Sequence, residues 1–232
     1  MLTIGPGLAF TPTTRHDTYS AIDLDKADLS GKVVLVTEAS KGVGKALAVA
    51  VAQAGALGLV LFARSDFYST NGACFSTTQA GQSLNVLTLA VDITNNQEVI
   101  AAAKRAGWLD VVINNAALFE AAYQVTRAVI PLLTKSKGDK TILNSTSLAA
   151  AIVAPAMSSY CISKLAVLRF TEFINAEYGY KGVVAYSEQP GSIPIDMTSL
   201  ALDEIKHMIV DTMEIPETVA TVASGRNWKA GT

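Results

Sequence analysis

A tyrosine and a lysine stand four residues apart in the stretch YCISK, at Tyr160 and Lys164. The sequence predicts a long helix over residues 158–178, and side chains four apart on a helix share a face. A free phenol is a poor acid or base at neutral pH because its pKa is near ~10. A neighbouring ammonium favours the phenolate, so this pair could pass a proton to or from a substrate oxygen. The alternative is an ordinary pair of exposed helical side chains.

A hydroxyl group precedes this pair in the sequence. Ser147 ends a predicted strand at residues 140–147, where it would donate a hydrogen bond to the same oxygen and polarise a carbonyl. Other chemistries lack their motifs. His16 and His207 lie far apart, and neither an HExxH motif nor a paired carboxylate suggests a metal. A GxSxG turn is also missing from the sequence. The residues therefore favour acid–base chemistry on an oxygen, without a metal.

The elements that must position these groups alternate between strands and helices. Apolar runs predict strands at residues 32–37, 57–63, 86–92, 109–115, 140–147 and 182–189. Helices are predicted at residues 43–54, 95–106, 120–135 and 158–178, with weak helical character between 66 and 84. Pro131 should lie near a kink or an end. This order predicts one Rossmann-like, doubly wound parallel sheet with helices on both faces, whose ligands bind beyond the carboxyl ends of the strands.

Length and composition suit one α/β domain. The chain has 232 residues, half of them hydrophobic, and we divide it into an irregular N-terminal arm at residues 1–30 and one domain at residues 31–232. The net charge of −2 gives no basic surplus for a nucleic-acid partner. The apolar stretch at residues 46–63 is interrupted by glycines, and we interpret it as a buried helix and strand rather than a membrane span.

Cysteine usage and the N-terminus bear on location. Cys74 and Cys161 form no CxxC pair, so a disulfide framework or a zinc site is not expected. The N-terminus lacks the basic start and apolar block of a signal peptide. We therefore expect a cytoplasmic protein.

The stretch TEASKGVG, residues 37–44, follows the first strand and opens a helix. Gly42 and Gly44 would let the backbone approach a pyrophosphate, and the helix start at Val43 would favour its negative charge. An ordinary strand–helix turn is the alternative. Arg64 and Ser65 follow the second strand, where an arginine suits the 2′-phosphate of an adenosine ribose. Lys41 could add a second positive charge, although both cations could simply be solvated.

From about Ser30 to Met197 the chain resembles the short-chain dehydrogenase/reductase family. The motifs stand in the family's order: TEASKGVG at 37–44, DIT at 92–94, NNAA at 114–117, YCISK at 160–164 and PGSIPIDM at 190–197. Ser147 stands thirteen residues before Tyr160, where the family keeps its catalytic serine. The stretch FTPTTRHDTYSAID and a late NW are similar to a fungal branch of the family.

The resemblance implies an NADP(H)-dependent reductase or dehydrogenase, with NAD(H) possible. Its substrate would be a ketone or secondary alcohol, small and apolar or natural-product-like. Tyr160 would be the acid/base, Lys164 the ribose anchor and Ser147 the carbonyl donor. The implied cofactor-binding residues are Thr37, Ser40, Lys41, Gly42, Val43, Gly44, Arg64, Ser65, Asp92, Ile93, Asn114, Ala116, Tyr160, Lys164, Pro190, Gly191 and Ile193. The resemblance also implies a homodimer or homotetramer that pairs through the YxxxK helix and the helix before it.

The glycine motif departs from the family's pattern. Glu38 replaces its first glycine, and because glutamate disfavours positive φ we expect the turn to change shape. Like charges ~4 Å apart at an effective dielectric constant of about 20 repel by roughly 4 kcal/mol. A carboxylate beside the phosphates would therefore weaken the cradle, which we still expect to be usable. Ala117 replaces a glycine, and Ile195 replaces a threonine that would meet the carboxamide.

After NNAALFE the chain is shorter than the family pattern, and Leu118 falls where the family's relay asparagine would stand. We favour segments missing from the available sequence over a true loss, because removing half a core helix would expose apolar surface at ~25 cal/mol per Å². These departures leave a second function open. The chain could have given up hydride transfer and act as an isomerase, a cyclase or a non-catalytic binding protein.

Overall fold

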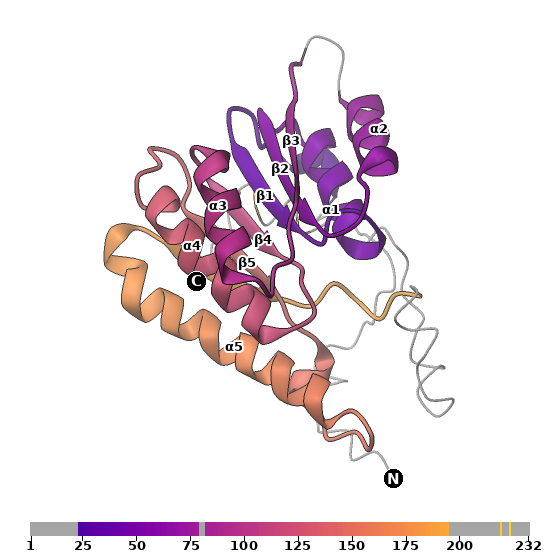
Figure 1. Ribbon diagram of the computed structural model, residues 1–232, viewed down its shortest axis with the longest axis vertical. Helices are drawn as coiled ribbons and strands as arrows, with labels where there is room; N and C mark the ends of the chain where they lie inside the picture. The colour runs from indigo at the N-terminus through magenta and orange to yellow at the C-terminus, as the bar shows by residue number, and fades with distance from the viewer. Residues whose placement is uncertain (1–22, 79–81, 195–218, 220–222, 224–232) are drawn as a thin grey trace.

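The computed structural model describes residues 23–78 and 82–194, together with Val219 and Ala223 (Figure 1). Its strands form one sheet in the order β3-β2-β1-β4-β5-β6, and every neighbouring pair is parallel. The strands are β1 Val33–Thr37, β2 Gly58–Ala63, β3 Asn85–Ala90, β4 Val111–Asn114, β5 Thr141–Ser145 and β6 Val184–Glu188. The predicted fold class is therefore confirmed.

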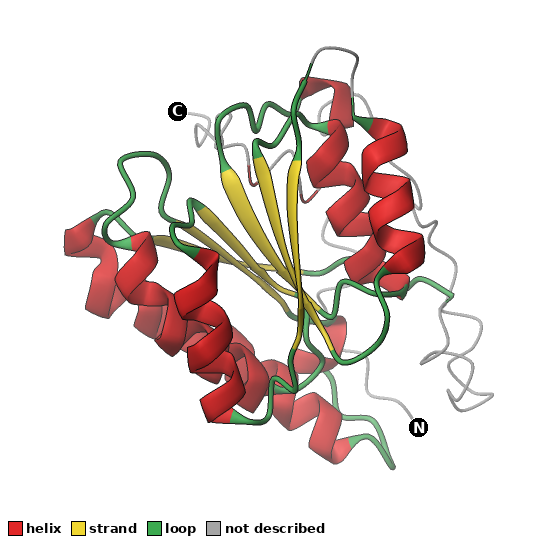
Figure 2. Ribbon diagram, turned by 45° about the horizontal axis from the view of Figure 1, so that its top comes forward, coloured by secondary structure: helices red, strands yellow, loops and turns green. Residues whose placement is uncertain are grey.

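Helices cover both faces of this sheet (Figure 2). On one face lie α1 Gly42–Gln53 and α2 Tyr68–Thr77. On the other lie α3 Asn96–Ala106, α4 Phe119–Leu133 and α5 Ser158–Tyr178. Three 3-10 turns complete the described elements: η1 Leu24–Lys26, η2 Leu148–Ala150 and η3 Gly179–Lys181. Pro131 lies close to the end of α4, as expected.

Strand β1 shows how the sequence builds two apolar layers. All of its residues are buried, as in a central strand of a parallel sheet. Successive side chains point to opposite faces, so that Val34 and Val36 pack with α1, whereas Val33 and Leu35 pack with α3 and α4. Because both faces are packed, the carboxyl ends of the strands are held in fixed relative positions.

The connection from β4 to α4 is short. Strand β4 ends at Asn114 and α4 begins at Phe119, where the family pattern predicted a longer stretch. The backbone N–H of Phe119 donates to Ser163 Oγ of α5 at 2.8 Å, which satisfies one of the free donors of the helix start. Leu118 and Tyr123 remain 54% and 44% exposed. A hydrogen bond to α5 thus holds the start of α4, and the expectation that segments are missing from the available sequence stays a prediction.

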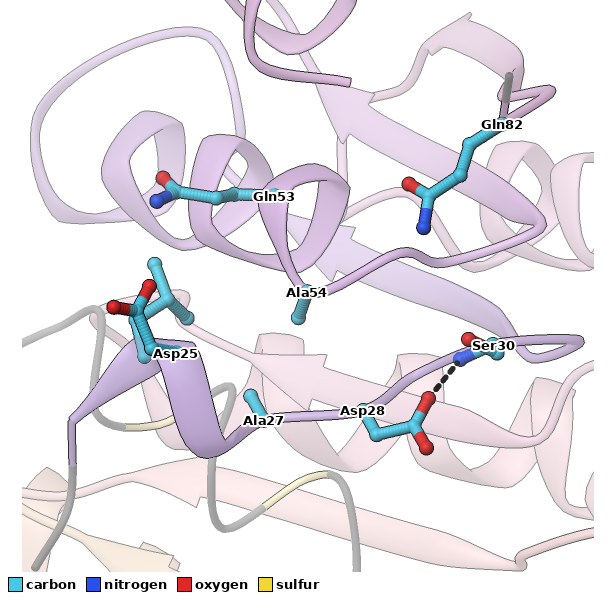
Figure 3. A pocket seen from close by; sticks show the side chains of 8 residues that line it. Asp25, Ala27, Asp28, Ser30, Gln53, Ala54 and Gln82 are labelled. Carbon is cyan, nitrogen blue, oxygen red and sulfur yellow. Dashed lines mark hydrogen bonds between the residues drawn. The ribbon is translucent and has the colours of Figure 1, made fainter. Parts of the chain in front are cut away.

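A hollow of about 350 Å³ lies between η1 and the end of α1, away from the carboxyl ends of the strands (Figure 3). Its lining residues are Leu24, Asp25, Ala27, Asp28, Ser30, Gln53, Ala54 and Gln82. The segment that forms one wall is fixed to the body, because Leu29 is fully buried and its N–H donates to Ala54 O at 2.8 Å. Residues 23–30 therefore pack on the domain, and the division at residue 30 stays a prediction.

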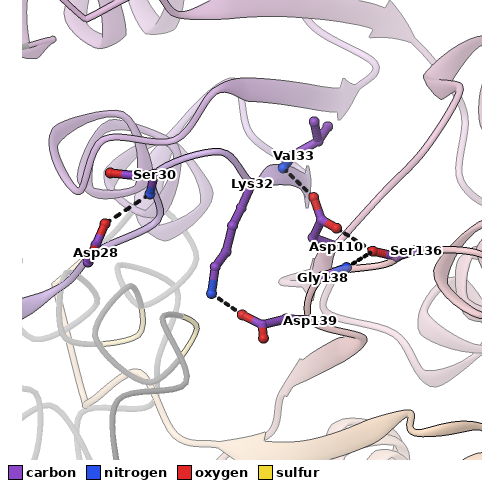
Figure 4. A network of polar contacts seen from close by, with 8 residues as sticks. All are labelled: Asp28, Ser30, Lys32, Val33, Asp110, Ser136, Gly138 and Asp139. Carbon is purple, nitrogen blue, oxygen red and sulfur yellow. Dashed lines mark hydrogen bonds and ion pairs between the residues drawn. The ribbon is translucent and has the colours of Figure 1, made fainter.

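A buried carboxylate joins the amino-terminal ends of the strands (Figure 4). Asp110 Oδ2 accepts from the N–H of Val33 at 2.9 Å, and Oδ1 accepts from the hydroxyl of Ser136. The backbone carbonyl of Asp110 also accepts from the N–H of Thr141 at 3.0 Å. Asp110 is only 5% exposed, so these bonds form where water cannot replace them. One side chain thus fixes the starts of β1 and β4 together.

We expect Asp110→Ala to destabilise the domain by about 2–3 kcal/mol, because the buried N–H of Val33 loses its acceptor. Asp110→Asn keeps an oxygen for that N–H and should cost about half as much. The free energy of unfolding in urea measures both. Equal losses for the two variants would contradict the role given to the Val33 hydrogen bond.

Candidate active site

The turn after β1 keeps a glycine-like backbone despite its glutamate. Glu38 has φ +54°, in the left-handed region that favours glycine. We expected glutamate to alter the turn; instead the residue takes up the conformation, at a cost of about 1–3 kcal/mol for a residue with a Cβ. The next glycine of the turn, Gly42, also has positive φ, at +55°.

Gly44 lets α1 approach this turn closely. A Cβ at Gly44 would lie 2.2 Å from the carbonyl oxygen of Glu38 and 2.7 Å from Asn115 Nδ2. The N-terminus of α1, which begins at Gly42, is thereby held against the end of β1. A helix start in this place attracts anions through its free N–H groups. Ser40 is partly buried and Val43 is buried in the same turn.

Thr37 and Ala116 were both predicted to bind cofactor, and the structure joins them to each other. Thr37 Oγ1 accepts from the N–H groups of Asn115 at 3.0 Å and Ala116 at 3.2 Å. Both Thr37 and Ala116 are buried, at 0% and 1% exposed. Their hydrogen bonds join the end of β1 to the turn after β4, and so they fix the relative positions of these two parts of the site.

A chain of buried polar side chains runs through the middle of the sheet. Asn114 Nδ2 donates to Asn144 Oδ1 at 2.8 Å and to Thr126 Oγ1 at 2.9 Å. Asn144 Nδ2 donates to Thr171 Oγ1 at 2.9 Å, and Ser187 Oγ donates to the same oxygen at 2.8 Å. These bonds connect the neighbouring strands β4, β5 and β6 to one another and to the helices α4 and α5. Asn114, which the family resemblance implied as a cofactor-binding residue, is therefore also a link between strands and helices, and the sequence did not reveal its partners.

Two cationic side chains follow the carboxyl ends of strands: Lys41 follows β1 and Arg64 follows β2. Lys41 and Arg64 are exposed, as is Ser65. After β3, Ile93 is buried, whereas Asp92 is partly exposed and accepts from the hydroxyl and the N–H of Thr94 at 2.7 and 3.0 Å. These hydrogen bonds lower the pKa of the Asp92 carboxyl. The carboxylate is thus available, charged, at the carboxyl edge of the sheet.

The three groups predicted to react lie on two neighbouring parts of the chain, the segment from the end of β5 to η2 and the helix α5. Lys164 is 3% exposed, and its ammonium lies 5.8 Å from the centre of the Tyr160 ring. Ser147 starts η2, which packs against α5, and its Oγ accepts from the N–H of Ala149 at 3.2 Å. One residue earlier, Thr146 Oγ1 donates to the carbonyl of Lys164 at 3.1 Å. The structure thus brings Ser147 beside the helix that carries Tyr160 and Lys164.

Two carboxylates act on the buried lysine. Burial lowers the pKa of Lys164, whereas the negative charges of Glu188 and Glu38 raise it. Burial also raises the pKa of Glu38, against the opposing effects of Arg64, Lys164 and Lys41. The Glu38 carboxyl therefore lies within electrostatic reach of Lys164 on α5 and of Arg64 and Lys41 near the glycine turn.

Glu188 is the functional residue that sequence reasoning missed. Asp196 lies outside the described residues, whereas Glu188 is the last residue of β6. Its Oε1 accepts a short hydrogen bond from Ser145 Oγ, while its Oε2 is buried without a hydrogen-bond partner. Burial raises the pKa of the Glu188 carboxyl to about 7. The signal available in the sequence was the position of Glu188, an acid near the carboxyl end of the strand predicted at residues 182–189.

The last group of predicted site residues lies in the turn that follows β6. Pro190 is partly buried, Gly191 has φ +93° and Ile193 is 3% exposed. Ile195, which departs from the family pattern, lies outside the described residues, as does Met197. All the predicted site residues in the described part of the chain thus follow a strand's carboxyl end or lie on η2 and α5.

A family model described as short chain dehydrogenase matches residues 32–122 and 119–205. The chain belongs to the short-chain dehydrogenase family. The two matched segments meet at residues 119–122, at the start of α4 where the chain is shortened.

Fungal relatives confirm the predicted branch of the family. This short-chain dehydrogenase is 35% identical to the short chain dehydrogenase pigC of Monascus ruber, with 98% of this chain and 86% of the relative covered. It is 34% identical to the short chain dehydrogenase citE of the same organism, covering 97% and 87% of the two chains. The short chain dehydrogenase andI of Emericella variicolor is 31% identical, with 96% and 86% covered.

Solved structures share the fold. A 7α-hydroxysteroid dehydrogenase in complex with NADH and 7-oxo glycochenodeoxycholic acid superposes with a TM-score of 0.74 at 24% identity, covering 89% of this chain and 91% of that one. A short chain dehydrogenase from Burkholderia cenocepacia in complex with NADP has a TM-score of 0.68 at 27% identity, with 86% of each chain covered.

The described residues contain neither a membrane-spanning helix nor a metal-binding cluster. Within residues 23–78 and 82–194, the helices are too short or too polar to cross a membrane. The same part of the chain holds no cluster of three or more side chains suited to a metal ion.

We expect Gly44→Ala to destabilise the domain by about 1–3 kcal/mol, because the added methyl group collides with backbone at Glu38. Gly72→Ala is the matched control, since Gly72 lies on α2 with open space where its Cβ would stand. The control should gain about 0.5–1 kcal/mol from helix propensity. Thermal unfolding of both variants decides. A Gly44 variant as stable as the parent would show that the turn yields easily.

Proposed function

We propose that this short-chain dehydrogenase transfers a hydride between NADP(H), with NAD(H) possible, and a ketone or secondary alcohol. The observation that supports the proposal is that Ser147 immediately precedes η2, which packs against α5, and that on this helix the Lys164 ammonium lies 5.8 Å from the centre of the Tyr160 ring. The glycine turn before α1 lies at the same edge of the sheet, because β1 and β5 are parallel and both flank β4.

Each group has a distinct task on the substrate oxygen. Ser147 donates a hydrogen bond to it and stabilises the negative charge that develops there during reduction. Tyr160 gives its phenolic proton to that oxygen, or accepts it during oxidation. Lys164 holds a positive charge beside the phenol and favours its deprotonated form. When bound, the nicotinamide supplies or accepts the hydride.

The residues present fit a dinucleotide, with one exception. Gly42, Gly44 and the start of α1 offer a place for a pyrophosphate, and Asp92 follows the third strand. Lys41 and Arg64 are exposed cations, which favour a 2′-phosphate and hence NADP(H). The exception is Glu38, whose negative charge opposes the phosphates.

The substrate side of the site is apolar. Residues 149–157 run from η2 to the start of α5 and contain Val153, which is 81% exposed. An exposed valine beside the reacting groups favours a small apolar or natural-product-like substrate over a charged one.

An exposed apolar surface on α4 and α5 supports assembly into a homodimer or homotetramer. It consists of Leu118, Tyr123, Ile162, Leu165, Leu168 and Phe173. We propose that a second copy of the chain covers it and that the assembly works in the cytoplasm. Neither a nucleic acid nor a membrane is proposed as a partner.

A second function is favoured by Glu38. A carboxylate within electrostatic reach of Arg64, Lys41 and Lys164 satisfies cations that would otherwise attract phosphates. A protein that had lost redox function would then use Tyr160 on a bound substrate as an isomerase or cyclase, or would bind without catalysis. Cofactor binding separates the two functions.

The proposed function is tested with Tyr160→Phe. This variant should bind NADPH as the parent does, in a fluorescence titration, and lose at least about 100-fold in kcat with an apolar ketone, because the proton donor is gone. Tyr180→Phe is the control, since Tyr180 is 81% exposed beyond the end of α5. If folded parent protein fails to bind millimolar NADPH, the redox proposal is rejected.

Glu38→Gly should tighten NADPH binding about tenfold or more, because it removes a negative charge and the strained backbone together. Glu38→Gln removes the charge alone and separates the two causes. Isothermal titration with each variant gives the dissociation constants. Unchanged affinity in both variants would show that Glu38 turns away from the phosphates. A sharp gain in affinity with no change in the natural activity would favour the second function.

A further inference from the structure

Ser145 stands between Lys164 and Glu188, a partly buried acid at the end of β6. Lys164 Nζ donates to the backbone carbonyl of Ser145 at 2.8 Å. The hydroxyl of the same serine donates to Glu188 Oε1. Ser145 and Glu188 are direct partners in the β5–β6 register, and the N–H of Thr146 donates to the carbonyl of Glu188 at 2.7 Å. The position of the acid relative to the lysine is therefore fixed by two strands and a side-chain bond.

The environment of Glu188 is unusual for a structural residue. Its Oε2 is shut off from solvent and has no hydrogen-bond partner, which is costly for a carboxyl group. An apolar residue could fill the end of a strand without this cost. The nearby charge that favours its ionised form is Lys164. The acid and the ammonium thus compensate each other in a place where either alone would be unfavourable.

We propose that Glu188 is a positioning residue for the reaction, which keeps Lys164 charged and so maintains the acidity of Tyr160. The proposal rests on the hydride-transfer function above. In this proposal Glu188 acts through the lysine, and its hydroxyl partner is Ser145 rather than Tyr160. Ser145 is its support, since the hydroxyl holds the carboxyl in place.

The titratable groups around Lys164 come from three parts of the chain. Glu188 faces it from β6, Glu38 from the turn after β1, and the Tyr160 ring from its own helix. Glu38 shares its field with Arg64 and Lys41, whereas Glu188 has Lys164 as its cation. Burial disfavours the ammonium, so loss of one carboxylate should move its titration to lower pH.

The titration of Lys164 is measured directly in the protein without cofactor. Lysine labelled with ¹³C at Cε gives one NMR signal per side chain, and Lys164→Arg assigns the signal. In Glu188→Gln, which keeps the shape and removes the charge, the Lys164 titration should move down by about one pH unit or more. Glu177→Gln, on an exposed part of α5, is the matched control and should leave it unchanged.

Kinetics then connect this shift with the reaction. The alkaline limb of the pH profile of kcat/KM with NADPH should move down in Glu188→Gln by the same amount as the lysine titration. Ser145→Ala should give a smaller shift in the same direction, because the carboxyl stays present but loses its support. Unfolding temperatures identify variants that have lost the fold, and the smaller Ser145 change keeps the test possible if Glu188→Gln is among them.

Each outcome decides the proposal. Matching shifts in the titration and in the kinetic limb support it. A Lys164 titration that is the same in Glu188→Gln and the parent overturns it. A shifted lysine with an unmoved kinetic limb overturns it too, since the charge would then not govern the phenol. A parent protein that titrates as expected but reduces no ketone with NADPH rejects the hydride-transfer function separately.

Discussion

A buried ammonium stays charged only where carboxylates or carbonyls stand close to it, and the site of this short-chain dehydrogenase is arranged around that constraint. Lys164 is almost fully buried, donates to the carbonyl of Ser145 and lies in the field of Glu188 and Glu38. Ser145 belongs to the fully buried strand β5, and Glu188 to the edge strand β6 that pairs with it. The electrostatics of the reacting phenol therefore depend on the order and register of the sheet.

The two acids act on the lysine from opposite sides but differ in their supports. Glu188 is fixed by strand pairing and by the hydroxyl of Ser145. Glu38 sits on a turn whose backbone is held in a glycine-like conformation, with cations around it. The first arrangement costs the protein an unpartnered oxygen, and the second costs it backbone strain and phosphate affinity.

The sequence predicted the fold well because its strands are apolar on both faces and its helices are separated by clear turns. The helix at residues 158–178 has the predicted bounds, and Ser147, Tyr160 and Lys164 lie where their motifs placed them. Glu188 was missed because a single acid at the end of a strand has no spacing rule. Its burial depends on Ser145, far away in the sequence and adjacent only through the register of β5 and β6. The glycine-like backbone of Glu38 was missed because residue preference alone argued against it.

The polar chain through the sheet constrains how this protein can change over time. Side-chain hydrogen bonds link Asn114 to Asn144 and Asn144 to Thr171, with Thr126 and Ser187 at the two ends of the chain. Replacement of one member by an apolar residue leaves its neighbours with unmet hydrogen bonds in a dry interior. A substitution at one of these positions should therefore be accompanied by substitutions at the others when related chains are compared.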